Sequence, residues 1–310
     1  MKILITGAGG MLGSDLASAL QADFTLVGVD CREVPHLTIP CRRVDLSQKT
    51  ETLDLVRAEN PDVIFHAAAM TDVDGCESRR DEAFRNNLEN TKYVVRAANE
   101  LGSLLIFFST DYVFDGTKEG EYVEDDPPNP LNVYAETKYL AEQFIQRHVD
   151  RYLIFRTSWL YGYYGKSFPR TILERALSVK RLTVVADQVG RPTYTQDIAA
   201  AFRELLSHQY QTLMANNRQI FHLAGEGIVS WANFARGILS LAQYDQVQVV
   251  DITSDQLDRP ARRPHNSVLS TAKLRDKFGV HLRSWQKAMP EFLKQVRAPR
   301  DEASSVHDKN

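Results

Sequence analysis

A glycine-rich turn near the start of the chain constrains the fold more than any other feature. Gly7, Gly10 and Gly13 follow the apolar segment 2–6, and the segment 11–20 that comes next has leucine at every fourth position, as on one face of a helix. In this context glycine allows a tight turn, and the N–H groups at the helix start attract a pyrophosphate. The turn therefore predicts a parallel α/β sheet that binds a dinucleotide.

The rest of the first half alternates short apolar segments with helical ones. Strands are expected at about 24–29, 63–65 and 104–108, and helices at about 81–101 and 134–149. Strands that are apolar on both faces and separated by helices indicate a parallel sheet covered on both sides. Because such crossovers are right-handed, we expect a doubly wound parallel sheet, the Rossmann type of α/β fold.

The second half is less regular and predicts a smaller lobe of mixed α/β structure. The expected division assigns residues 1–162 with 193–224 to the dinucleotide-binding Rossmann domain, and 163–192 with 225–297 to a substrate-binding lobe. Residues 298–310 show no apolar pattern, and we expect a disordered tail there.

Composition excludes several classes of protein. A chain of 310 residues with 43% hydrophobic and 25% charged residues is typical of a globular protein with its own core. The net charge of −3 provides no basic field for nucleic acid or anionic lipid, and no apolar run approaches the ~20 residues that span a bilayer. The odd count of three cysteines fits a reducing compartment. We therefore expect a cytoplasmic protein with neither nucleic-acid nor membrane partners.

Further cofactor residues are predicted where the strands end. Asp30 ends the second strand, where a carboxylate accepts the ribose hydroxyls of NAD and repels a 2′-phosphate, whereas Arg32 attracts one. NADH is therefore expected to be slightly preferred over NADPH. The other residues expected to line the cofactor come from the turn and from the ends of strands: Met11, Leu12, Asp45, Leu46, Ala67, Ala68, Ala69 and Ser109.

Tyr134 and Lys138 are the candidate catalytic pair. On a helix they share one face, and an ammonium beside a phenol lowers the phenol pKa from ~10. Such a tyrosine passes a proton to or from a carbinol oxygen. The spacing alone is a weak signal, but the helix follows a strand that ends at Thr110, whose hydroxyl can donate to the same oxygen.

These segments, together with several others, resemble the extended short-chain dehydrogenase/reductase family over roughly residues 1–295. The resemblance rests on Ser-Thr-Asp-Tyr-Val-Phe-Asp-Gly at 109–116, Pro-Leu-Asn-Val-Tyr at 130–134 with Thr137 and Lys138, Phe-Arg-Thr-Ser-Trp-Leu-Tyr-Gly at 155–162, Gly-Arg-Pro-Thr at 190–193, Phe-His-Leu-Ala-Gly at 221–225, and Arg263-Pro264 with Asn266-Ser267. It implies reduction of the 4-keto group of a nucleotide-linked sugar, dTDP-4-dehydro-L-rhamnose, to dTDP-L-rhamnose with NADH or NADPH. In that reaction Tyr134 donates the proton, Lys138 holds the nicotinamide ribose and Thr110 orients the carbonyl.

The resemblance also implies a set of substrate residues and raises the question of a metal. The substrate residues it implies are Thr71, Val73, Thr110, Asp111, Trp159 as an apolar wall, and Arg263 at the diphosphate. Some family members hold magnesium at a dimer interface through two acidic residues. Here the corresponding positions are Asp15 and Gln196, and an amide is a poor ligand for a hard dication. We therefore predict no metal site, and homodimer formation stays open.

Three readings compete with this function. The first changes the sugar or makes the chain an epimerase that recycles its NAD. The second, a dehydratase, is disfavoured because Tyr112 follows Asp111 where the dehydratases carry Glu. The third is a non-catalytic subunit resembling the regulatory partner of methionine adenosyltransferase, and the presence of Thr110, Tyr134 and Lys138 argues against it.

Overall fold

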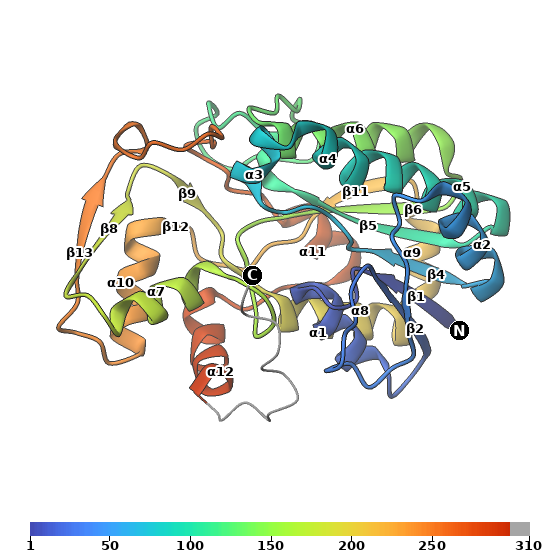
Figure 1. Ribbon diagram of the computed structural model, residues 1–310, viewed down its shortest axis with the longest axis horizontal. Helices are drawn as coiled ribbons and strands as arrows, with labels where there is room; N and C mark the ends of the chain where they lie inside the picture. The colour runs from blue at the N-terminus through green and yellow to red at the C-terminus, as the bar shows by residue number, and fades with distance from the viewer. Residues whose placement is uncertain (298–310) are drawn as a thin grey trace.

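The computed structural model describes residues 1–297, so the tail predicted from residue 298 lies outside the described residues. One large sheet occupies one end of the molecule and a smaller lobe the other (Figure 1). No helix among residues 1–297 is long and apolar enough to cross a membrane.

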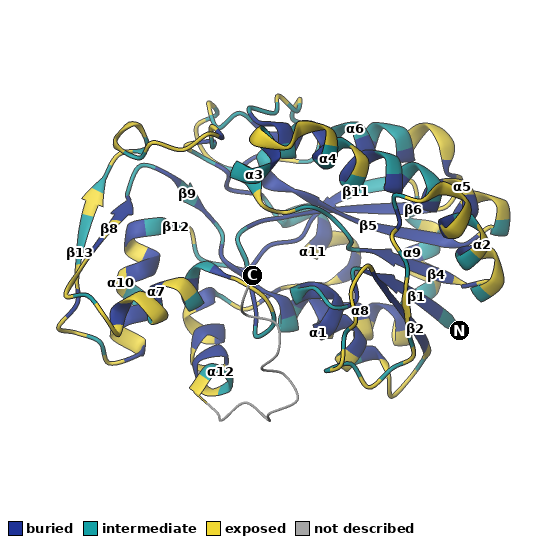
Figure 2. Ribbon diagram, viewed as in Figure 1, coloured by how far each residue is buried: buried dark blue, intermediate teal, exposed yellow. Residues whose placement is uncertain are grey.

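The large sheet has seven parallel strands, as the alternating pattern predicts. In spatial order they are β11 (Gln219–His222), β6 (Tyr152–Thr157), β5 (Leu104–Thr110), β4 (Val63–His66), β1 (Lys2–Thr6), β2 (Thr25–Asp30) and β3 (Cys41–Arg43). All seven residues of β5 are buried, because helices cover both faces of the sheet (Figure 2). The order reverses direction between β1 and β4, and the carboxyl ends there form a crevice for a ligand.

Two helical layers enclose the sheet. One face packs against α1 (Met11–Leu20), α8 (Thr195–His208), α9 (Tyr210–Ala215) and α11 (Ala272–Phe278). The other packs against α2 (Lys49–Glu59), α5 (Asn90–Leu101) and α6 (Val133–His148). The doubly wound Rossmann fold is therefore confirmed. Leu274 and Phe278 of α11 pack beneath the large sheet, although the sequence places their segment in the smaller lobe.

The smaller lobe has its own core. It comprises α7 (Phe168–Ala176), α10 (Trp231–Leu241), α12 (Trp285–Arg297) and the parallel pair β8 (Arg181–Val185) and β13 (Gln248–Ile252). Two-residue strand pairs link it to the sheet: β7 (Leu160–Tyr161) with β10 (Thr193–Tyr194), and β9 (Val189–Gly190) with β12 (Val229–Ser230). The proposed boundaries between the two domains stay a prediction.

The helix expected at 81–101 differs from the prediction in its middle. The structure has α4 (Arg80–Phe84), a π-helical turn η1 (Arg85–Glu89) and then α5. A π turn inserts one extra residue and rotates the side chains that follow, and such turns often occur at functional sites. The hydrophobic periodicity does not reveal this insertion, because the apolar residues on both sides of it still face the sheet.

Candidate active site

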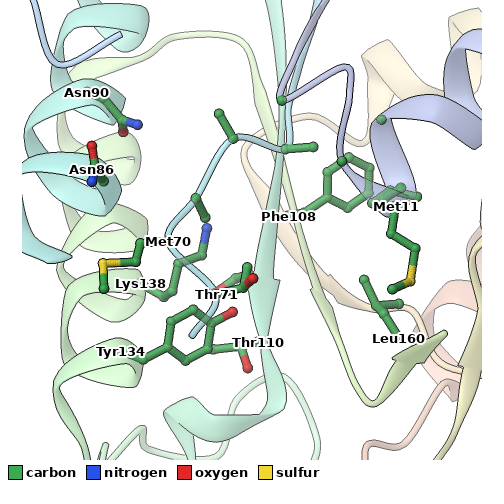
Figure 3. Close-up of a pocket in the computed structure, with 18 of the residues that line it drawn as sticks. Met11, Met70, Thr71, Asn86, Asn90, Phe108, Thr110, Tyr134, Lys138 and Leu160 are labelled. Carbon is green, nitrogen blue, oxygen red and sulfur yellow. The ribbon is translucent and has the colours of Figure 1, made fainter. Parts of the chain in front are cut away.

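A cavity of about 810 Å³ lies at the carboxyl ends of the central strands and reaches the smaller lobe. It brings together every predicted cofactor and catalytic residue, from Gly7 to Lys138, and the predicted substrate residues Thr71, Val73, Asp111 and Trp159. Figure 3 shows Tyr134 and Lys138 on α6, with the Tyr134 ring next to Thr110.

The glycine turn is shaped by close backbone contacts. Gly7 has φ +65°, and a Cβ there would lie 2.8 Å from the backbone of Ala68. A Cβ on Gly13 would collide with the Gly7 carbonyl oxygen, whereas one on Gly10 would lie 3.1 Å from that atom. The first glycine thus serves the turn, and the third allows α1 to approach β1.

Asp30, at the end of β2, lines the same part of the cavity as the glycine turn. It is 7% exposed, and its carboxylate accepts the Gly9 N–H at 3.0 Å and the Arg32 N–H at 3.1 Å. The Arg32 side chain is mostly exposed, with Nε 3.7 Å from the Asp30 carboxylate. The carboxylate and the guanidinium therefore stand side by side where the adenosine ribose of a dinucleotide would lie.

The residues present fit a nicotinamide dinucleotide. The glycine turn leaves the start of α1 open to a pyrophosphate. In addition, the buried hydroxyl oxygens of Ser109 and Thr157 line the cavity and have no hydrogen-bond partner within residues 1–297. Buried polar atoms are normally paired, so these two atoms indicate a polar ligand.

Thr110 and Asp111 are neighbouring polar residues that line the same cavity as Tyr134. The Thr110 hydroxyl donates to Asp111 Oδ1 at 3.2 Å and accepts the Tyr112 N–H at 3.2 Å. Asp111 Oδ2 is buried without a partner in the described part of the chain. Burial raises the pKa of Asp111 to about 7, so this group takes up a proton more readily than an ordinary carboxylate.

Burial, more than charge, governs the Tyr134–Lys138 pair. Burial raises the pKa of Tyr134 well above its usual range and lowers that of Lys138 to about 7. The Lys138 ammonium lies 4.0 Å from the centre of the Phe107 ring. The expected lowering of the Tyr134 pKa is therefore not found, because burial of the phenol raises it.

The π turn places Asn87 between two segments of the site. Its side-chain oxygen accepts the Met70 N–H at 2.7 Å, and its amide nitrogen donates to the Met70 carbonyl at 3.2 Å and to Thr137 Oγ1 at 3.0 Å. Thr137 precedes Lys138 on α6, and Met70 lies in the loop after β4. Asn87 thus holds the loop that carries Thr71 against the helix that carries Tyr134 and Lys138.

Trp159, expected to form an apolar wall for the substrate, lines the cavity together with a second tryptophan. It has φ +47°, a strained value for a bulky residue, and its ring stacks on Trp231 at 3.4 Å with an interplanar angle of 4°. Both rings line the cavity. Trp159 follows β6 and Trp231 begins α10, so the stack joins the sheet to the smaller lobe.

Arg263 is not among the residues that line the cavity. Its guanidinium makes two 2.9 Å hydrogen bonds to the Asp74 carboxylate and one to the Ala261 carbonyl. The side chain is 11% exposed. Asp74 belongs to the short helix α3 (Val73–Ser78), which also carries Val73. The ion pair therefore connects α3 to the segment around Arg263. Arg263 as a diphosphate ligand stays a prediction that this geometry does not favour.

Several cavity residues escape prediction from sequence. They come from segments with no motif of their own: Met70, Glu82, Asn86, Asn90, Lys166 and Trp231. Asn86 on η1 and Asn90 at the start of α5 lie on the same side of the cavity as Lys138 (Figure 3). The adjacent Asn86 and Asn87 in the middle of an amphipathic helix are the available sequence signal. Asparagine is a poor helix former, so two in a row suggest that their side chains have a specific role there.

The two positions considered for magnesium, Asp15 on α1 and Gln196 on α8, do not line the cavity. Asp15 is buried and accepts the Thr195 hydroxyl at 2.5 Å, and burial raises its pKa to about 6. Within residues 1–297 no group of three His, Cys, Asp or Glu side chains is placed to hold a metal ion. That this chain uses no metal stays a prediction.

A doubly wound sheet, a glycine turn at β1 and a Tyr-x-x-x-Lys helix beside Thr110 together define an oxidoreductase of the extended short-chain dehydrogenase/reductase class. The family described as RmlD substrate binding domain matches residues 1–298. The chain belongs to this family.

Relatives with a named activity cover nearly the whole chain. The dTDP-4-dehydrorhamnose reductase of Sinorhizobium fredii is 36% identical over 293 residues, 93% of this chain and 95% of that protein. The enzyme of the same name from Aggregatibacter actinomycetemcomitans is 36% identical over 304 residues, 96% of this chain and 98% of that one. The crystal structure of dTDP-4-dehydrorhamnose reductase from Bacillus anthracis, in complex with NADP, superposes with a TM-score of 0.86 at 31% identity, covering 95% of this chain and 99% of that one.

Proposed function

We propose that this protein reduces the 4-keto group of dTDP-4-dehydro-L-rhamnose to give dTDP-L-rhamnose. The observation that carries the proposal is one cavity that joins the glycine turn to Thr110, Tyr134 and Lys138. The names of the relatives in S. fredii and B. anthracis support the substrate. When held by the glycine turn and Lys138, a reduced nicotinamide cofactor would supply the hydride for the sugar carbon.

In this mechanism the chain supplies the proton and the orientation. Tyr134 donates its phenolic proton to the sugar oxygen, and its raised pKa keeps that proton in place until it is needed. The Thr110 hydroxyl orients the carbonyl. Lys138 holds the nicotinamide ribose and supplies positive charge to the phenolate that forms. The stacked indoles of Trp159 and Trp231 form the apolar wall for the sugar nucleotide.

We further propose that either nicotinamide cofactor is used, with NADH slightly preferred. The Asp30 carboxylate supports NADH because it accepts ribose hydroxyls and repels a 2′-phosphate. The exposed Arg32 guanidinium beside it offers a partner to that phosphate, and the NADP bound to the B. anthracis relative fits this second option. The cytoplasmic location and the homodimer stay predictions.

The direct test mixes the purified protein with dTDP-4-dehydro-L-rhamnose and follows oxidation of NADH and NADPH in separate reactions. Rapid turnover with formation of dTDP-L-rhamnose supports the reaction, and the ratio of kcat/KM values gives the cofactor preference. A protein that binds cofactor but shows no turnover would contradict the proposal and favour another keto-sugar or the regulatory-subunit reading.

A further inference from the structure

A fully buried ion pair lies one helical turn beyond the catalytic lysine. Tyr134, Lys138 and Glu142 follow one another at intervals of four residues, so they share one face of α6. The Glu142 carboxylate accepts hydrogen bonds from Nε and Nη2 of Arg156, on β6, at 3.0 and 2.8 Å. Glu142 is 0% exposed and Arg156 2% exposed. The pair therefore joins the catalytic helix to the sheet in a dry environment.

The pair is not explained by stability. Taking two charges out of water costs more than their attraction usually returns, and apolar residues of similar volume often stabilise such a site better. The Arg156 side chain also lies 5.1 Å from the Phe114 ring, so its plane is fixed by packing as well as by hydrogen bonds. A charged pair held this firmly beside the active site points to a role in the site itself.

The charges around Lys138 show what that role is. Glu142 is the anion whose field favours the Lys138 ammonium, in opposition to burial. On β4, His66 is hydrogen-bonded to Thr6 and Thr91, and burial lowers its pKa to about 3, so it stays neutral. Asp111 acts on Tyr134 rather than on Lys138. Of the other charged groups on the helices packed against α6, Glu77 accepts the Val133 N–H, and three more are paired: Arg80 with Glu136, Lys92 with Glu89, and Glu82 with Arg79.

We propose that the Glu142–Arg156 pair is a positioning element of the active site: it fixes α6 on β6 and supplies the negative charge that favours the ammonium form of Lys138. Arg156 holds the Glu142 carboxylate ionised and in place one turn from Lys138. This inference rests on the proposed function only for its effect on turnover. The charge state of Lys138 is measured without substrate.

The test replaces the pair by apolar residues, Glu142→Leu with Arg156→Met, which keeps the volume and removes both charges. The ¹³Cε signal of Lys138, assigned as the one missing from Lys138→Met, is titrated by NMR in cofactor-free protein. We expect its midpoint to fall by about one pH unit, because an opposite charge at close range is lost. Glu136→Gln, which breaks an exposed ion pair on the same helix, is the matched control and leaves the midpoint unchanged.

A purely structural pair gives a different result. The double variant would then fold with Lys138 titrating as in the wild type, and that outcome overturns the proposal. If the double variant does not fold, the same titration of the near-isosteric Glu142→Gln decides, with a fall of the midpoint expected and an unchanged midpoint contradicting us. If the protein is an active reductase, the alkaline limb of its kcat–pH profile should move to lower pH by the same amount in these variants. If the variants show the expected fall of the Lys138 midpoint but the protein does not turn over the keto-sugar, the result counts against the proposed function alone.

Discussion

The two ends of the cavity are built by different means. At the nucleotide end, Gly7 and Gly13 let backbone approach backbone, and a single carboxylate, Asp30, is held by two N–H groups. At the catalytic end, α6 and the end of β5 bring together buried side chains that can gain or lose protons. The pKa of Asp111 and that of Lys138 are both about 7. The first end is specified by sterics, the second by burial and charge.

This difference predicts how each end fails. A steric site is damaged by added volume and responds little to pH. An electrostatic site keeps its shape when one polar atom is removed, but it loses function and changes its pH dependence. Four predictions test this contrast, beginning with the largest expected effect.

Replacing the proton donor should cost the most. Tyr134→Phe removes one hydroxyl from the catalytic end, and general acid catalysis typically contributes ~10²–10⁴-fold, so kcat should fall by that factor. Steady-state kinetics with the keto-sugar substrate measures it. The half-buried Tyr139, on the same helix, provides the control Tyr139→Phe, which should stay within about twofold of the wild type. Near-full turnover in Tyr134→Phe would exclude the assigned role.

The buried acids should make stability depend on pH. Burial raises the pKa of Asp111 from 3.8 to about 7, so the folded state binds more protons than the unfolded state in this window. Its contribution is full below about pH 4 and is lost as the pH rises through 7. Asp111→Asn should remove that part of the slope, worth on the order of a few kcal/mol, as measured by urea unfolding from pH 4 to pH 8.

Asp15, a buried acid on α1 that does not line the cavity, provides the comparison. Its raised pKa is about 6, so Asp15→Asn should flatten the stability profile only up to that pH. If Asp111→Asn has the same pH profile as the wild type between pH 6 and 7, burial does not raise the Asp111 pKa as described.

Added volume should damage the nucleotide end. Gly13→Ala forces a methyl group onto the Gly7 carbonyl oxygen, and overpacking of this kind typically costs ~1–3 kcal/mol, so both the unfolding free energy and the affinity for the cofactor should fall. Gly10→Ala, with 3.1 Å available, should do less. Denaturant unfolding and fluorescence titration with NADH measure the two effects. Equal losses in both variants would show that the third glycine is not the tight one.

The smallest effect is expected at Asp30. Asp30→Ala removes the carboxylate that separates the two cofactors, so the ratio of kcat/KM for NADH to that for NADPH should fall by about tenfold, the value of one charge-assisted contact. Arg32→Ala should move the ratio in the opposite direction. An unchanged ratio in Asp30→Ala would remove this residue from cofactor selection.

The same contrast explains how much could be predicted from the sequence. The strands, the glycine turn and the Tyr134–Lys138 helix follow from local patterns, and the structure confirms the fold they imply. The Arg263–Asp74 pair joins residues far apart in the chain, and no local pattern indicates it. Likewise, the raised pKa of Tyr134 depends on how deeply tertiary packing buries it, whereas spacing reports only its neighbour Lys138.

Packing also explains the misses inside the cavity. Asn86 and Asn87 lie in the π turn, which adds one residue to a helix whose apolar face stays continuous. The hydrophobic periodicity of the sequence therefore does not reveal the turn. Trp231 reaches the cavity only because the smaller lobe folds back onto the end of β6. Residues delivered by a second lobe carry no signal in the strand that they meet.

The stacked tryptophans have an optical consequence. The chain has three tryptophans, and two of them, Trp159 and Trp231, lie face to face at 3.4 Å across the junction of the two lobes. Indoles this close share their electronic transitions, so the pair should produce a split signal of opposite signs in the circular dichroism spectrum. Any motion that separates the two lobes would uncouple the two indoles, so the loss of this signal would report that motion without an added label.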